Sequence, residues 1–291
     1  MKLLSMMKHK DFATFILTHG RAGRVETFRT LRKCGYTGRI VLVVDDMDKQ
    51  LEAYKSEFGD QVYVFSKQKA IEMTDECDNF QDRRAVVYAR NICWDIARDL
   101  GIKYFFMLDD DYNDFRHKMD NNNRFIDRSW MRDLDSVLDA MLDYYISIPA
   151  LTIAMAQGGD FVGGMDGTSW RKPRRKAMNS FICSTDRPFK FFGSTNEDVN
   201  AYVTLGSRGD IFLTIVKVAL QQKQTQQNAG GLTDIYKAFG TYVKSFYSVM
   251  CHPSSVKVYF LPGSTYDRIH HRVTWKYTVP VILSEEHKKR S

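Results

Sequence analysis

The sequence lacks any long hydrophobic run. Its apolar stretches, such as Ile40–Val44 and Tyr104–Leu108, have the length of single strands, whereas a transmembrane helix needs about 20 apolar residues. Residues 1–11 are basic but contain neither the apolar segment nor the small-residue cleavage site of a secretory signal. These absences predict a soluble, cytoplasmic protein that does not enter a membrane.

Cysteine is also scarce, with five residues in a chain of 291. The cysteines are widely scattered and show neither the paired spacing of a zinc site nor the density of a disulfide framework. We therefore expect them to pack as small apolar side chains in a reducing compartment. They are Cys34, Cys77, Cys93, Cys183 and Cys251.

Several nucleotide-binding and catalytic motifs are missing. The segment that begins at His19 contains no Gly-Lys-Ser/Thr, which excludes a P-loop, and the chain has no good Gly-x-Gly-x-x-Gly signature. A nucleophile elbow is absent as well. The sequence therefore argues against P-loop nucleotidases, dinucleotide-dependent oxidoreductases and α/β-hydrolases.

Positive charge is in excess and locally concentrated. The net charge is +7 and the pI about 9.0, which favours a polyanionic partner or a phosphorylated small molecule. Residues 171–176 contain five cations, and a loop that contacts phosphates and a solvated loop fit this cluster equally well. The five cations are Arg171, Lys172, Arg174, Arg175 and Lys176.

Strands and helices alternate through the first third of the chain. We predict strands over 12–18, 39–44, 61–65 and 104–108, and helices over 25–33, 49–57 and 82–100, the last ended by Gly101. Alternation of this kind predicts an α/β fold with a mostly parallel sheet that binds ligands at the carboxyl ends of its strands. The second half is less regular.

In that second half we expect a helix over 130–145, strands over 150–156, 178–184, 211–218 and 256–261, a surface loop over 221–227 and a helix from residue 233. No linker divides the chain, so we predict a single domain. Its nucleotide-binding half covers about 10–115, its acceptor-binding half about 116–280, and a basic tail 281–291.

Three consecutive carboxylates, Asp109–Asp111, follow the buried strand 104–108 directly. Adjacent carboxylates repel one another unless a cation neutralises them, and Mg²⁺ or Mn²⁺ takes oxygen ligands while keeping positions open for phosphates. The alternative is an acidic turn in which Asn113 and Asp114 are ordinary turn formers.

Candidate donor-binding residues follow the first two strands. His19, Arg21 and Arg24 lie beside two glycines, where cations and free backbone amides suit a diphosphate. Asp45 ends the second strand, where it could contact a ribose or base or simply serve a turn.

Two later segments could complete the chemistry. Glu197 and Asp198 are expected in the first turn of a helix capped by Ser194 or Thr195, either as acids favoured by the helix dipole or as a general base. Neutral imidazole can complete a Mn²⁺ shell, so His270 or His271 is a further candidate metal ligand.

The order of these motifs resembles nucleotide-sugar glycosyltransferases of the A-type fold. Tyr88-Ala-Arg-Asn91, the helix to Gly101, and Tyr104–Asp111 match that family's Ala-Arg-Asn helix, apolar strand and Asp-x-Asp motif. The resemblance implies that Asp109 and Asp111 bind Mn²⁺ or Mg²⁺ against the diphosphate of a UDP-sugar or related donor. It also implies that Arg90 and Asp110 lie on the donor side.

A narrower resemblance rests on Thr18-His-Gly-Arg21, Leu108–Tyr112 and Asn196–Asn200. These segments are similar to the TET/JBP-associated glycosyltransferase family, whose members occur in bacteriophages. The resemblance implies transfer of a sugar to 5-hydroxymethylcytosine or 5-hydroxymethyluracil in phage DNA, in the host cytoplasm. The basic cluster at 171–176 would then contact double-stranded DNA, and Trp170 or Phe181 would stack or wedge against bases.

Three other functions stay open on the sequence alone. The same fold could glycosylate a protein, a glycan or a small molecule, or it could transfer a nucleotidyl group and release pyrophosphate. A catalytically inactive DNA-binding module is the third alternative. The sugar, the stereochemistry of transfer and the oligomeric state cannot be read from the sequence.

Overall fold

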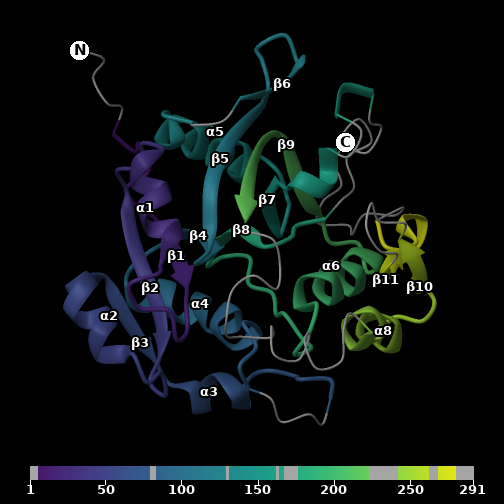
Figure 1. Cartoon of the computed structure of the whole chain (residues 1–291), viewed down its shortest axis with the longest axis horizontal. Coiled ribbons are helices and arrows are strands. Elements are labelled where there is room, and N and C mark those ends of the chain that lie inside the picture. The colour runs from purple at the N-terminus through teal and green to yellow at the C-terminus, as the bar shows by residue number, and fades with distance from the viewer. Residues whose placement is uncertain are drawn as a thin grey trace, which may run out of the picture.

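The structure is a computed structural model that describes residues 6–78, 83–128, 131–161, 164–166, 176–222, 242–261 and 268–279. Within these ranges no helix is both long enough and apolar enough to cross a membrane. The described residues form one large sheet with helices around it and a separate two-stranded sheet (Figure 1).

The large sheet has nine strands in the order β3-β2-β1-β4-β8-β7-β9-β5-β6. Only β8 and β5 run against the direction of the others, because each pairs antiparallel with both of its neighbours. The predicted α/β class with a mostly parallel sheet is therefore confirmed. The strands are β1 Phe12–Leu17, β2 Arg39–Asp45, β3 Val62–Phe65, β4 Tyr104–Asp109, β5 Tyr112–Met119, β6 Phe125–Arg128, β7 Thr152–Ala156, β8 Ser180–Ser184 and β9 Phe212–Gln222.

The helices bury their apolar sides against both faces of this sheet. The helices are α1 Glu26–Lys33, α2 Leu51–Phe58, α3 Lys67–Glu72, α4 Val87–Asp99, α5 Leu134–Ser147, α6 Glu197–Ser207 and α8 Tyr242–Cys251, with short 3₁₀ turns η1 Gly59–Gln61, η2 Gly158–Phe161, η3 Gly164–Asp166 and η4 Trp275–Tyr277. Alternate residues of the central strands belong to two core clusters, one with α4 and α6 and the other with α1, α2 and α5. Because helices cover both faces of these strands, the sequences of the strands are nearly continuous apolar runs.

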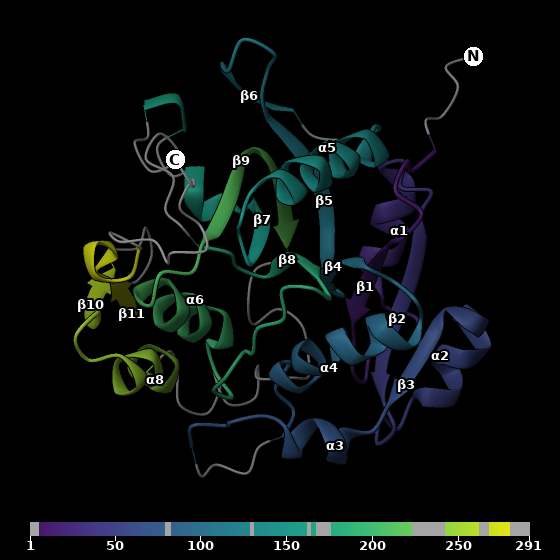
Figure 2. The same cartoon turned by 180° about the vertical axis from the view of Figure 1, so that it is seen from behind.

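The small sheet is the hairpin of β10 Val256–Leu261 and β11 Arg268–Val273. Figures 1 and 2 show it beside α6 and α8, at the opposite end of the molecule from α2. In both views α6 lies between this hairpin and β4. The hairpin therefore extends the end of the fold that carries α6.

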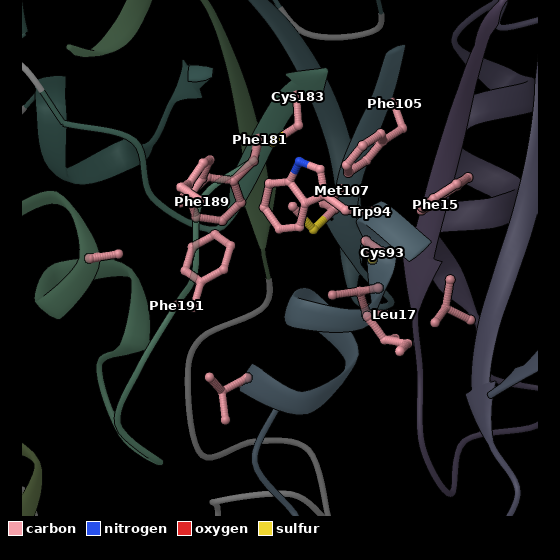
Figure 3. Packing of buried hydrophobic residues seen from close by; sticks show 14 of the residues in the cluster. Phe15, Leu17, Cys93, Trp94, Phe105, Met107, Phe181, Cys183, Phe189 and Phe191 are labelled. Carbon is pink, nitrogen blue, oxygen red and sulfur yellow. The ribbon is translucent and has the colours of Figure 1, made fainter. Parts of the chain in front are cut away.

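The cluster under α4 is dominated by aromatic rings (Figure 3). Trp94 packs edge to face on Phe105 and Phe189, with ring centroids 5.5 and 4.9 Å apart, and its indole N–H donates to the Ser184 carbonyl at 3.1 Å. Edge-to-face geometry is favoured by the ring quadrupoles. This packing holds α4, and with it Arg90, in a defined place against β4 and β8.

Most predicted elements are present with boundaries shifted by a few residues. The predicted C-terminal stop at Gly101 is confirmed: Gly101 has φ +64°, and Ile102 N–H donates to the Ala97 carbonyl at 2.8 Å. The start of the helix predicted from residue 233 lies outside the described residues, and the next described helix is α8, Tyr242–Cys251.

Two local predictions are wrong, and the alternative in which Asn113 and Asp114 are turn formers does not hold. Both residues lie in a strand, because β5 begins at Tyr112 and pairs with β9, which comes from much later in the chain. Ser194 and Thr195 do not cap α6, since the N-cap position is Asn196. Gln221 and Gln222 belong to β9 rather than to a surface loop.

Candidate active site

The acidic turn between β4 and β5 is held by the start of α1. The Thr27 hydroxyl donates to the Asp109 carbonyl at 2.7 Å and accepts from the Tyr112 N–H at 2.9 Å. The Thr27 N–H donates to the Asp110 carbonyl at 3.1 Å. One threonine thus satisfies the backbone on both sides of the turn, which fixes the directions of the three carboxylates.

The three aspartates have different partners. Asp109 pairs with Arg90 at 3.1 Å. The Asp110 carboxylate accepts from Arg21 at 2.5 Å and from the Thr18 hydroxyl at 2.7 Å. Asp111 accepts from the Gln222 amide at 2.8 Å, with Arg21 3.9 Å away.

Asp110, the middle carboxylate, is the most deeply buried of the three, with a side chain 5% exposed, compared with 23% for Asp109 and 16% for Asp111. The two outer carboxylates therefore remain the ones that can reach a ligand.

Arg90 joins the acidic turn to α6. Its guanidinium donates through Nη2 to Asp109 Oδ1 at 3.1 Å and through Nε to Glu197 Oε1 at 2.9 Å. The side chain is 1% exposed, and its guanidinium carbon lies 4.9 Å from the Phe181 ring centroid and 5.7 Å from that of Phe191. A single buried cation therefore holds the first aspartate and the first residue of α6 in fixed relation.

Crowding of carboxylates shows in the ionisation of Asp109. Burial raises its pKa to about 7, and the nearby charges of Asp111 and Glu197 act in the same direction, against the opposing effect of Arg90. Since an added cation would relieve this repulsion, the site has the electrostatic character expected of a metal-binding turn.

Glu197 and Asp198 lie in the first turn of α6, as predicted. The preceding Asn196 adopts left-handed backbone angles, φ 55° and ψ 38°, and its side chain donates to the Lys244 carbonyl at 2.7 Å. This contact anchors the start of α6 to α8. Burial, with the Glu197 charge, raises the pKa of Asp198 to about 6.

A second network surrounds the carboxyl ends of β1 and β2. His19 Nδ1 lies 2.7 Å from Asp45 Oδ2, and this hydrogen bond raises the pKa of the imidazole. The Gly20 N–H donates to Asp48 at 2.7 Å, and the Arg21 N–H donates to the Tyr54 hydroxyl at 2.7 Å. The loop after β1 is thus tied to the loop after β2.

The predicted donor contacts have different surroundings. Arg21 and Asp110 pair with each other, His19 pairs with Asp45, and Arg24 is exposed. The Arg90 side chain is 1% exposed, and its ion-pair partners in the structure are Asp109 and Glu197. Contact of these residues with a donor stays a prediction.

The donor set at the acidic turn suits a hard divalent cation. Mg²⁺ is commonly held by one or two carboxylates together with substrate phosphates, and Asp109 and Asp111 would supply those carboxylates. In the described part of the chain, no cluster of three or more His, Cys, Asp or Glu side chains is arranged to hold a metal. A metal here would therefore need oxygen ligands from the donor.

The structure does not bring the two histidines into such a cluster with the aspartates. His270 and His271 lie on β11, in the separate hairpin, with ring centroids 4.5 Å apart. His271 Nδ1 is buried without a hydrogen-bond partner, and burial lowers the pKa of His271 to about 3. Their assignment as metal ligands stays a prediction.

Most of the predicted DNA-contacting cluster, Arg171–Arg175, lies outside the described residues, as does Trp170. Lys176 is described and pairs with Asp160 at 2.6 Å. The suggestion that Phe181 stacks on bases is wrong, because it is 1% exposed and packs in the core beneath Arg90.

Sequence reasoning missed several site residues. They are Thr18, which carries no signal beyond its place in the Thr18-His-Gly-Arg21 segment, and Thr27, Tyr54 and Gln222. Each acts by a hydrogen bond to a residue far along the chain, as when Gln222 reaches Asp111. Nothing in their local sequence distinguishes them from ordinary surface residues, although Gln222 ends an apolar run that could have been extended.

The Arg90 bridge leads to a test of stability. We expect Arg90→Met to lower the free energy of unfolding by about 3–5 kcal/mol, because it leaves two carboxylates in a largely buried place without their cation. Arg90→Lys should be intermediate, since it keeps the charge but loses the two-nitrogen fork. Chemical denaturation measures both.

Arg98→Met is the matched control on the same helix. Arg98 is half exposed and pairs with the partly exposed Asp95, one turn away, so its loss should cost less than about 0.5 kcal/mol. Equal effects of the two substitutions would contradict a stabilising role for the Arg90 bridge.

The described part of the chain forms a mixed sheet with a carboxylate-rich turn at the end of β4. A family model described as TET-Associated Glycosyltransferase matches residues 12–231. The chain belongs to this glycosyltransferase family. Both the predicted family and the predicted enzyme class are thereby confirmed. No curated protein sequence matches the chain.

Solved structures of several glycosyltransferases are similar. Glucosyl-3-phosphoglycerate synthase from Mycobacterium tuberculosis, in complex with Mn²⁺, UDP and phosphoglyceric acid, has 11% identity and a TM-score of 0.44 over 93% of this chain and 88% of its own. A mannosyltransferase from Pyrobaculum calidifontis with GDP-Man and Mn²⁺ has 11% identity and a TM-score of 0.46 over 85% and 74%. For S. aureus TarS 1–349 the values are 14% and 0.41 over 78% and 62%, so the chain spans less than two thirds of that protein.

Proposed function

We propose that the protein transfers a sugar from a nucleotide-diphosphate donor to the hydroxymethyl group of 5-hydroxymethylcytosine or 5-hydroxymethyluracil in double-stranded phage DNA. UDP-sugar is the expected donor, and Mn²⁺ or Mg²⁺ the expected metal. Family membership supports the class of reaction. The choice of acceptor rests on the resemblance of the motifs at Thr18–Arg21 and Asn196–Asn200 to phage enzymes.

The observation that carries the proposal is the bridge through Arg90. It links Asp109, at the donor end of β4, to Glu197, at the start of α6. Sugar transfer needs a donor diphosphate and an acceptor hydroxyl close together. The ion pairs of Arg90 hold Asp109 and Glu197 close to each other, which supports a donor half-site at the first and an acceptor half-site at the second.

On the donor side, Asp109 and Asp111 would hold the metal against the diphosphate. A bound divalent cation offsets the negative charge that develops on the leaving nucleoside diphosphate. Arg21 lies next to both Asp110 and Asp111, where its charge would favour the same phosphates. His19 and Asp45, at the ends of β1 and β2, would face the nucleoside.

On the acceptor side, a carboxylate of α6 takes the proton from the hydroxymethyl group. The acceptor oxygen then bonds to the anomeric carbon as the bond from that carbon to the diphosphate oxygen breaks. A primary alcohol is a weak nucleophile, so proton removal in the transition state accelerates attack. Asp198, whose pKa is raised to about 6, is suited to hold that proton near neutral pH.

The test is nucleoside diphosphate release with Mn²⁺, a panel of nucleotide sugars, and duplex DNA that contains cytosine, 5-hydroxymethylcytosine or 5-hydroxymethyluracil. Digested nucleosides are analysed by mass spectrometry. We expect release only with a hydroxymethylated duplex, together with a gain of one hexose mass on the modified base.

Other outcomes redirect the proposal. Donor hydrolysis without a modified nucleoside would keep the glycosyltransferase and move the acceptor to a protein, glycan or small molecule. Pyrophosphate in place of a nucleoside diphosphate would indicate nucleotidyl transfer. Duplex binding with no donor turnover under any condition would support an inactive DNA-binding module.

A further inference from the structure

Positive charge is concentrated in the C-terminal unit formed by α8, the β10–β11 hairpin and η4. Over the whole chain, 42 Lys and Arg residues are nearly balanced by 35 Asp and Glu. The described ranges 242–261 and 268–279 contain five cations and no acidic residue. The cations are Lys244, Lys257, Arg268, Arg272 and Lys276.

The register of the hairpin places cations opposite each other. Lys257 pairs with Arg272, and Tyr259 with His270, so these positions share one face of the two strands. Lys257 and Arg272 are both exposed, and the Arg272 guanidinium carbon lies 5.6 Å from the Tyr259 ring centroid. Directly opposed like charges destabilise a hairpin unless an anion lies between them.

The other face of the hairpin is the one that packs on α8. Val256 is fully buried, and the Ser245 hydroxyl of α8 donates to the Ile269 carbonyl of β11 at 3.0 Å. The face that carries Lys257 and Arg272 is therefore turned away from α8. Phe260, which lies on the same face as Val256, is 69% exposed at the far end of β10. Tyr277 is 53% exposed, with Lys276 Nζ 4.6 Å from its ring centroid.

The hairpin unit borders the proposed acceptor end of the site. Asn196 donates to the Lys244 carbonyl and, at 3.1 Å, to the Ser248 hydroxyl of α8. The Lys244 charge acts on both Asp198 and His271. Burial raises the pKa of Asp198, and the charge of Lys244 opposes that rise. Burial lowers the pKa of His271, and the charges of His270 and Lys244 lower it further. Lys244 thus lies between the start of α6 and β11.

We propose that the face of the β10–β11 hairpin with Lys257, Tyr259 and Arg272 is the docking surface for the phosphate backbone of duplex DNA. This inference rests on the proposed function and names where the acceptor is held. A base that enters the site near Asp198 leaves its flanking phosphates outside, and opposed cations beside aromatic rings match a phosphate backbone and its exposed bases.

The test compares DNA binding by the full-length wild type, the double variant Lys257→Gln/Arg272→Gln and a control. The control, Lys10→Gln/Lys55→Gln, removes the same charge from exposed residues in the N-terminal part of the chain. A fluorescent hydroxymethylated duplex is titrated at several salt concentrations. We expect the hairpin variant to bind roughly tenfold more weakly at low salt and to reduce the slope of log affinity against log salt by about 2, because two phosphate contacts are lost.

The outcomes separate this proposal from the proposed function. If the wild type binds and modifies the duplex, and the hairpin variant binds it as tightly as the control does, the docking surface is refuted while DNA glycosylation is not. A wild type that turns over donor but binds no duplex would overturn both the DNA acceptor and this surface. Loss of binding to anionic vesicles by the hairpin variant, with DNA binding unchanged, would assign the surface to a membrane. Thermal unfolding of each variant checks that the fold is kept.

Discussion

Asp198→Asn is expected to lower sugar transfer by roughly 10²–10⁴-fold, the usual contribution of a general base, while donor binding persists. Asp198 follows Glu197 in the first turn of α6, and its carboxylate accepts from the Val199 N–H at 2.8 Å. Burial raises its pKa to about 6, which places a proton acceptor close to the pH of the reaction. Turnover is measured by nucleoside diphosphate release, and donor binding by calorimetry.

Glu197→Gln is the matched comparison, one residue earlier on the same helix. Glu197 is already engaged by the buried Arg90 guanidinium, so we expect this substitution to lower the free energy of unfolding and to affect turnover less. Asp198→Asn should leave stability nearly unchanged, since it removes a charge that Glu197 repels. If Glu197→Gln abolishes transfer and Asp198→Asn does not, Glu197 is the base and Asp198 a neighbour.

Asp109→Asn and Asp111→Asn are each expected to reduce metal-dependent turnover by at least about 100-fold, in the range seen when one charge-stabilising group is lost. Both substitutions keep the shape of the side chain but remove the negative charge that a divalent cation requires. Asp111→Asn should be the cleaner test, because its hydrogen-bond partner Gln222 is neutral and its ion pair with Arg21 is long, at 3.9 Å. Asp109→Asn also takes a partner from Arg90 and should lower stability as well.

Titration of Mn²⁺ in the presence of donor measures the effect directly. The control is Asp60→Asn, which neutralises an exposed carboxylate of η1 and should leave both metal affinity and turnover unchanged. Wild-type rates and wild-type Mn²⁺ affinity in Asp109→Asn and Asp111→Asn together would refute the assignment of these aspartates to a metal.

Much of the fold could be predicted because its central strands are buried on both faces. Residues 40–44 and 104–108 are uninterrupted apolar runs, and each is followed by carboxylates. Such a pattern depends on neighbouring residues only. The alternation with helices then leads to a parallel sheet by general rules of connection.

Prediction failed where a strand is polar and its partners are distant. Tyr112–Met119 contains Asn113, Asp114 and His117, yet it forms β5 because β9 and β6 flank it. The same reason applies to Asn196. Its left-handed backbone angles and its bonds to α8 depend on a helix that begins more than 40 residues later.

The sequence by itself determined the chemical inventory: three carboxylates after a buried strand, an acidic pair at a helix start, and an excess of positive charge. These features depend on residue type and near neighbours, which are written in the chain. Only the tertiary structure decided how they are connected. Arg90 joins Asp109 to Glu197, and the hairpin register sets Lys257 opposite Arg272, because contacts between distant residues follow from packing and strand pairing rather than from local pattern.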